Sequence, residues 1–121
     1  MNRLLGVVDD DLGILRAVQR LLKAAGFWVE TFASAEALLA SDDLPRIRCL
    51  VVDIHLGGMN GFDLQARLVE IGHPIPVIFI TGLDDPLGRQ RARAAGAVDY
   101  LRKPFDESAL VEAIHRALSV T

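Results

Sequence analysis

The stretch "LLGVVDDDLGIL" (Leu4–Leu15) joins two kinds of structure around three consecutive acids. The apolar run Leu4–Val8 predicts a buried strand, and a helical period begins directly after the acids. Asp9, Asp10 and Asp11 lie between the two, and each carboxylate raises the cost of ionising its neighbours. We therefore expect solvent, a helix dipole, a nearby cation or a bound metal to offset their charge. Asp11 is predicted to be an N-cap or first-turn acid of the following helix rather than a ligand.

The same alternation of strand and helix continues along the chain. Further apolar runs typical of strands occupy Trp28–Phe32, Cys49–Val52, Val77–Ile80 and Tyr100-Leu101. Helices are predicted over Leu12–Ala25, from the cap Ser34 through 35–40, over 61–72, from Asp85-Pro86 to Gly96, and after Asp106 with a core face of Leu110, Val111, Ile114 and Leu118. Strict β–α alternation predicts an α/β domain of the (βα)5 type, with a parallel sheet and helices on both faces.

Composition excludes several classes of protein. The 121 residues predict one domain, and a chain that is 51% hydrophobic and 24% charged is globular rather than disordered. A net charge of −3 leaves no basic footprint for direct nucleic-acid binding by this domain. Cys49 is the single cysteine, which rules out an internal disulfide and is typical of a reducing compartment. The chain shows neither a signal peptide nor a run long enough for a membrane span, so we expect a cytoplasmic domain.

Unusual polar residues follow four of the predicted strands. Asp9 and Asp10 come after the first strand, Asp53 after the third, Thr81 after the fourth and Lys103 after the fifth. The carboxyl ends of parallel strands meet at one edge, and that edge holds the ligand crevice in open α/β sheets. We therefore expect these five side chains to form a shared site.

The residue types predict metal-assisted phosphoryl chemistry. Mg²⁺ prefers one or two carboxylates together with waters and a phosphate oxygen, and Asp10 and Asp53 could supply those carboxylates while Asp9 orients a coordinated water. A carboxylate can also attack phosphorus and form an aspartyl phosphate. Lys103 and the metal would then neutralise the phosphoryl oxygens, and Thr81 could donate a hydrogen bond to the same group.

Motifs at four of the predicted strands, well separated along the chain, resemble the receiver domain of two-component response regulators. They are "VVDDD" after the first strand, "LVVDIHLGGMNG" around the third, "FITG" at the fourth, and "AGAVDY" running into "LRKPF" at the fifth. The resemblance covers essentially the whole chain, residues 1–121, and is closest to receivers of the nitrogen-fixation regulator type. It implies a flavodoxin-like (βα)5 fold with strand order 2-1-3-4-5, in a bacterial signalling protein whose output domain is absent from this chain.

The resemblance also implies a role for each site residue. Asp53 would be the phosphoacceptor, and the ligands of Mg²⁺, or of Mn²⁺ in its place, would be Asp10, Asp53, the main-chain carbonyl of His55 and, through water, Asp9. A side-chain role of His55 as a ligand is not favoured, because no other histidine has a suitable spacing. Thr81 and Lys103 would contact the phosphoryl group, Tyr100 would turn inward with Thr81 as the aromatic switch, and the Lys103-Pro104 bond would be cis.

The loop after Asp53 departs from the family pattern, and two further positions bear on the lifetime of the phosphoryl group. The family often has proline and a further residue where this chain has Gly57-Gly58, and two glycines would loosen the loop that carries the metal-binding carbonyl. His55 and Leu83 occupy positions that tune the lifetime of the phosphoryl group in the family. Because Leu83 cannot hold an attacking water by hydrogen bonding, we expect slow-to-moderate autodephosphorylation.

The helix that begins at Asp85-Pro86 predicts a surface for partners. Its sequence is poor in large apolar residues, and weakly packed elements are the ones that shift in switching. With the fifth strand it presents Arg89, Arg93, Tyr100 and Arg102, on the face that the family uses for output contacts or a homodimer. The family also implies a histidine kinase or phosphotransfer protein as the phosphoryl donor.

Three alternatives remain open. A haloacid-dehalogenase-type phosphatase would also use a strand-end aspartyl nucleophile, but it usually carries a second acid where this chain has His55. A flavodoxin-like cofactor binder would need a Ser/Thr-rich phosphate loop in place of Asp9–Asp11. A receiver-like docking module that no longer takes phosphate is compatible with the Gly57-Gly58 departure.

Overall fold

The computed structural model describes residues 3–83 and 85–119. The predicted domain covers residues 1–121, so its first two and last two residues and residue 84 lie outside the described part. Five strands form one sheet in the order β2-β1-β3-β4-β5, and every neighbouring pair is parallel. The strands are β1 (Leu4–Val8), β2 (Trp28–Phe32), β3 (Ile47–Asp53), β4 (Val77–Thr81) and β5 (Asp99–Arg102). This architecture confirms the predicted flavodoxin-like fold and its strand order.

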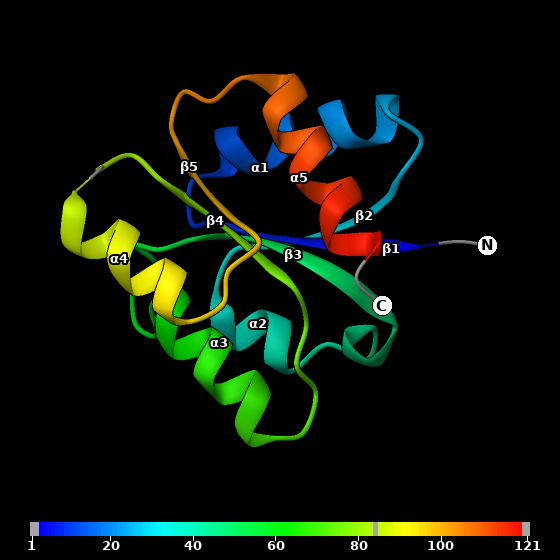
Figure 1. Ribbon diagram of the computed structural model, residues 1–121. Helices are drawn as coiled ribbons and strands as arrows, with labels where there is room; N and C mark the ends of the chain where they lie inside the picture. Colours follow the sequence, from blue (N-terminus) through cyan, green and yellow to red (C-terminus); the bar gives the residue numbers. More distant parts are fainter. Residues whose placement is uncertain (1–2, 84, 120–121) are drawn as a thin grey trace.

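Helices cover both faces of the sheet (Figure 1). In the described part of the chain they are α1 (Leu12–Ala24), α2 (Ala35–Leu39), α3 (Gly61–Glu70), α4 (Pro86–Ala94) and α5 (Glu107–Ser119). α1 and α5 lie on one face, and α2, α3 and α4 lie on the other. No helix among the described residues combines the length and the apolar character that crossing a membrane requires.

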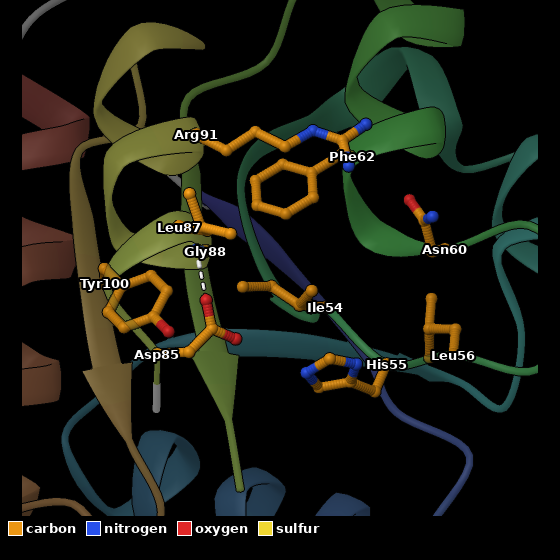
Figure 2. A pocket seen from close by; sticks show the side chains of 10 residues that line it. All are labelled: Ile54, His55, Leu56, Asn60, Phe62, Asp85, Leu87, Gly88, Arg91 and Tyr100. Carbon is orange, nitrogen blue, oxygen red and sulfur yellow. Dashed lines mark hydrogen bonds between the residues drawn. The ribbon is translucent and has the colours of Figure 1, made fainter. Parts of the chain in front are cut away.

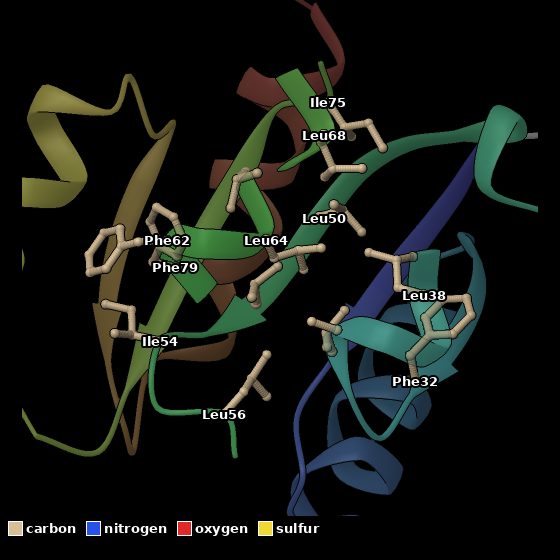
Figure 3. Packing of buried hydrophobic residues seen from close by; sticks show 14 of the residues in the cluster. Phe32, Leu38, Leu50, Ile54, Leu56, Phe62, Leu64, Leu68, Ile75 and Phe79 are labelled. Atoms are coloured by element: carbon tan, nitrogen blue, oxygen red, sulfur yellow. The ribbon is translucent and has the colours of Figure 1, made fainter. Parts of the chain in front are cut away.

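Alternate residues of the central strands pack into two cores. On β3, Cys49 and Val51 face the layer of α1 and α5, whereas Leu50 and Val52 face the layer of α2, α3 and α4. Figure 3 shows the second core, in which the rings of Phe62 and Phe79 pack with their centroids 4.8 Å apart. Burial of both faces explains why these strands read as continuous apolar runs.

Side-chain caps fix the starts of the helices that lead out of the site. Asp11 accepts hydrogen bonds from the amides of Gly13 and Ile14, which confirms its predicted capping role. Ser34 caps α2 and Asp85 caps α4 in the same way. Asn60 caps α3, a role that was not among the expectations from the sequence. Each cap satisfies amides that a helix start would otherwise leave without a partner.

The structure extends three of the predicted strands, and β4 ends on Thr81 instead of Ile80. β3 begins at Ile47 rather than Cys49, after a short 3₁₀ helix (Leu44–Arg46), and it ends on Asp53 itself. β5 likewise runs over Asp99–Arg102 instead of two residues. Asp53, Asp99 and Arg102 are paired in register with residues of β4. The strands therefore continue into polar residues that the apolar pattern does not mark.

Candidate functional site

The carboxyl edge of the sheet brings the predicted polar residues together. Asp9 directly follows β1, Asp53 and Thr81 are the last residues of β3 and β4, and Lys103 directly follows β5. Three of these side chains are buried, with relative exposures of 0% for Asp9, 6% for Asp53 and 0% for Thr81. Buried polar groups need partners, and their contacts define the site.

An acidic cluster with one lysine forms its centre. Oxygen atoms of Asp9, Asp10 and Asp53 lie within 4.8 Å of one another, and Asp10 is the exposed member. Lys103 Nζ donates to Asp9 Oδ2 at 2.7 Å and to Asp53 Oδ2 at 3.2 Å. The peptide bond between Lys103 and Pro104 is cis, as the resemblance implied.

Burial and charge set the protonation of this cluster. Burial raises the pKa of Asp9, and the charge of Asp53 adds to that shift, while hydrogen bonds from Lys103 and from the amide of Asp11 oppose it. Burial lowers the pKa of Lys103, but its hydrogen bond to Asp9 and the charges of both carboxylates outweigh burial, so the net shift is upward. Lys103 is therefore an ammonium at neutral pH and offsets part of the acidic charge.

The donor set of the cluster fits a hard divalent cation. Three carboxylates converge on one point, and one of them is open to solvent, which leaves room for coordinated waters. Oxygen ligands without thiolate or imidazole suit Mg²⁺ or Mn²⁺ rather than a soft metal. Asp9, Asp10 and Asp53 are thus the residues that could hold such an ion.

The loop that follows Asp53 is bonded to the same acids. His55 N donates to Asp53 Oδ1 at 3.0 Å, and Gly57 N donates to Asp10 Oδ2 at 3.3 Å. Of the two glycines, Gly58 has a φ of +74°, in the left-handed region that favours glycine. The loop is therefore tied to the acidic cluster by its backbone amides.

Thr81 reaches the edge, but its hydroxyl is bonded to the following loop. Thr81 Oγ1 donates to the carbonyl of Leu83 and accepts from the amide of Leu83, both at 3.0 Å. The Leu83 side chain is 68% exposed. The structure thus places Thr81 at the same edge of the sheet as the acidic cluster. The side chain of Leu83 lies in solvent.

Tyr100 lies beneath the first turns of α4 instead of at the acidic cluster. Its ring is buried, and the guanidinium of Arg89 lies over it at 4.7 Å from the centroid. Its hydroxyl oxygen would be 3.3 Å from a Cβ on Gly88. Tyr100 also lines a cavity of about 470 Å³ with His55, Asp85 and Arg91 among its other walls (Figure 2). The cavity joins the loop after Asp53 to the start of α4.

Residues 5–115 match the response regulator receiver domain family. The chain belongs to that family. It is 40% identical over 114 residues to response regulator protein TodT of Pseudomonas putida, covering 94% of this chain and 50% of TodT. It is 38% identical over 111 residues to transcriptional regulatory protein FixJ of Rhizobium meliloti, covering 92% of this chain and 54% of FixJ.

Solved receiver structures agree with this assignment. The structure of FixJ-N aligns with a TM-score of 0.88 at 36% identity, covering 98% of this chain and 95% of that chain. The resemblance read from the sequence is therefore confirmed, FixJ-like relatives included. This receiver domain spans about half the length of the curated relatives that it matches.

The predicted partner surface of the receiver domain lies on α4 and β5. Arg89, Arg93 and Arg102 are exposed there. Ala92 is the one buried residue of α4 among those described, compared with five on α5. Light packing of α4, which the sequence predicted from its lack of large apolar residues, is therefore confirmed.

Two contributors to the site were missed by sequence reasoning. A Cβ on Gly61 would come within 2.9 Å of the Asp53 carbonyl oxygen, so this glycine lets α3 start directly against the end of β3. Glu36 Oε2 accepts a hydrogen bond from Met59 N at 3.4 Å. The glycine in the first position of the predicted helix was a usable signal for the role of Gly61. Nothing in the sequence connects Glu36 with residue 59.

Proposed function

We propose that this receiver domain accepts a phosphoryl group on Asp53 from a histidine kinase or phosphotransfer protein, with Mg²⁺ bound at the acidic cluster. The observation that carries the proposal is the placement of one buried carboxylate against one ammonium. Asp53 Oδ2 lies 3.2 Å from Lys103 Nζ, and the oxygen atoms of Asp9 and Asp10 are within 4.8 Å. The site combines a nucleophile, a cation and a place for a metal.

Each residue has a distinct task in the transfer. A carboxylate oxygen of Asp53 attacks phosphorus, an O–P bond forms as the donor's P–N bond breaks, and the departing imidazole takes up a proton. Lys103 neutralises the phosphoryl oxygens. Asp10, Asp53 and the His55 carbonyl would hold Mg²⁺ directly, and Asp9 would hold it through water. When bound, Mg²⁺ or Mn²⁺ supplies positive charge next to the phosphoryl group.

The phosphoryl group would then act through Thr81 and Tyr100. It adds negative charge and strong acceptor oxygens at the sheet edge. The Thr81 hydroxyl exchanges its bonds with Leu83 for one to the phosphoryl group, and Tyr100, whose ring is buried beneath α4 in this structure, follows Thr81. Because α4 is lightly packed, this change biases an existing two-state equilibrium of the α4-β5-α5 surface.

The altered surface would control an output domain or a partner. We assign Arg89, Arg93 and Arg102, which are exposed, to this contact, including a homodimer formed through the same face; Tyr100 is buried beneath α4 and is assigned only to the switch. Relatives about twice as long as this chain support an output domain in the whole protein. We place the domain in the bacterial cytoplasm, as a signalling module rather than a metabolic enzyme, without direct binding to nucleic acid or membrane.

His55 and Leu83 are assigned to the lifetime of the phosphorylated state. The exposed side chain of Leu83 has no group that could orient an attacking water. Hydrolysis is therefore slow to moderate, and loss of the phosphoryl group within a few seconds would contradict this assignment.

The test is intact mass after incubation with acetyl phosphate, with and without Mg²⁺. Wild type is compared with Asp53→Asn, which keeps the shape of the side chain and removes the nucleophilic charge. We expect a gain of one phosphoryl group that requires both Mg²⁺ and Asp53. A matched control, Asp63→Asn, replaces an exposed aspartate of α3 and leaves the gain intact.

Other outcomes would favour the alternatives. Absence of the gain while Mg²⁺ is demonstrably bound would indicate a phosphorylation-independent docking module. Rapid turnover of phosphate monoesters would indicate an aspartyl-phosphate phosphohydrolase, although His55 stands where such enzymes usually carry their second acid.

A further inference from the structure

The first half of the loop between β3 and α3, residues 54–60, is held by the acids of the site itself. His55 N donates to Asp53 Oδ1 at 3.0 Å, and Gly57 N donates to Asp10 Oδ2 at 3.3 Å. Both acceptors belong to the proposed metal site, so a bound cation would draw on the same carboxylates. We therefore expect these two hydrogen bonds to change when a metal ion binds.

Glu36 holds the second half of the loop from outside the site. Its Oε2 accepts from Met59 N at 3.4 Å and lies 3.3 Å from the position of a Cβ on Gly58. Its backbone is fixed, because Ser34 caps α2 and Ala35, the preceding residue, is fully buried. A carboxylate on a fixed backbone thus contacts the loop where Gly58 takes its left-handed conformation.

The contact between Glu36 and Met59 lies next to Gly57-Gly58, where this chain departs from the family pattern. Two adjacent glycines have more conformations to lose than other residues, so the loop needs additional contacts to stay in one arrangement. The Glu36 carboxylate restrains the backbone directly after Gly57-Gly58. It does so without being a member of the acidic cluster formed by Asp9, Asp10 and Asp53.

We propose that Glu36 is a positioning residue for the metal-binding loop. Its hydrogen bond to Met59 keeps the backbone around His55 and Gly57 in the arrangement that receives the cation. The loop restraint stands on contacts within the protein, whereas its consequence for Mg²⁺ rests on the proposed function. Residues around the direct ligands of a metal commonly set its affinity in this way.

The restraint is tested first without metal, by amide hydrogen exchange of Met59 measured by NMR. Glu36→Ala removes the acceptor, and Glu36→Gln keeps an acceptor oxygen while removing the charge. We expect Met59 exchange to be about fivefold faster in the alanine variant, the effect of one lost hydrogen bond, and close to wild type in the glutamine variant. Unchanged exchange in Glu36→Ala would overturn the proposal.

The consequence for metal is tested by calorimetric titration with Mg²⁺. We expect affinity about tenfold weaker in Glu36→Ala and within about twofold of wild type in Glu36→Gln. Glu107→Ala is the matched control, because Glu107 is another exposed acid in the first turn of a helix. Equal losses in Glu36→Gln and Glu36→Ala would show that charge acts instead of the hydrogen bond, and would overturn the proposal.

If the proposed function is wrong, the Mg²⁺ titration and the Met59 exchange measurement give different answers. If the wild-type protein binds no Mg²⁺, the metal-dependent function is wrong, while Met59 exchange still decides whether Glu36 restrains the loop. Thermal unfolding separates both results from misfolding, because alanine at an exposed helical position leaves the melting temperature near that of wild type.

Discussion

The ammonium group of Lys103 lies between two buried carboxylates that would otherwise repel each other. Its hydrogen bonds to Asp9 and Asp53, at 2.7 and 3.2 Å, join the residue that follows β5 to the ends of β1 and β3. A charge-assisted bond in a buried setting costs more to break than an exposed ion pair. Lys103 therefore contributes both to the electrostatics of the site and to its geometry.

Replacing Lys103 separates phosphoryl transfer from metal binding. In Lys103→Met we expect phosphorylation of Asp53 by acetyl phosphate to slow about a hundredfold, because a preorganised cation no longer stabilises the transferred group. Mg²⁺ binding persists, since the carboxylates remain and a neighbouring positive charge has gone. Rates come from intact mass over time, and Mg²⁺ affinity comes from calorimetry.

Lys23→Met is the matched control for this prediction, because it removes an exposed lysine of α1. Its phosphorylation rate stays at the wild-type level. Equal rates in Lys103→Met and Lys23→Met would show that Lys103 has no part in the transfer.

The helices α4 and α5 differ sharply in how they are anchored. Among the described residues α4 buries Ala92 alone, whereas α5 buries Leu110, Ala113, Ile114, Ala117 and Leu118. Apolar burial is the main source of helix stability in a folded protein. We therefore expect α4 to open locally and α5 to open only when the domain unfolds.

Removal of the helix caps makes this difference measurable. Asp85 accepts from Gly88 N at the start of α4, and Asp106 accepts from Ser108 N at the start of α5. In Asp85→Ala we expect faster amide exchange confined to α4, with the free energy of global unfolding nearly unchanged. In Asp106→Ala the free energy of unfolding falls by about 1 kcal/mol, measured by urea denaturation. Equal global losses in both variants would refute the independent opening of α4.

The centre of the molecule is closed to solvent on both faces of the sheet. Cys49 lies on β3, between β1 and β4, and its side chain is fully buried. Burial raises the pKa of this thiol from 9.0 to about 12. The thiolate therefore forms far more readily in the unfolded chain than in the folded one.

Thiol labelling of Cys49 consequently reports on unfolding of the whole domain. At neutral pH we expect reaction with Ellman's reagent to follow the global unfolding equilibrium and to accelerate with urea in parallel with loss of structure. The raised pKa also predicts that this thiol's contribution to stability is complete below pH 9.0 and is lost as the pH rises towards about 12. Fast labelling of the native protein in the absence of urea would contradict this account.

Local patterns in the sequence were sufficient for the elements and for the centre of the site. Apolar runs ending in Asp9, Asp53, Thr81 and Lys103 mark the strand ends, and parallel strands must bring such ends to one edge. Strand order came from the resemblance to receiver domains, because β–α alternation alone allows several orders. The cap at Asp11 was predictable, since a cap acts within three residues of its own position.

Contacts between elements depended on packing in three dimensions. The burial of Tyr100 beneath α4, the approach of α3 to β3 at Gly61 and the bond from Met59 to Glu36 have no local signature. Each depends on the relative placement of elements far apart along the chain, which many side chains determine together. Periodicity and capping act between near neighbours, so the sequence specified the sheet edge and its acids, whereas the folded arrangement of helices and loops settled what holds them in place.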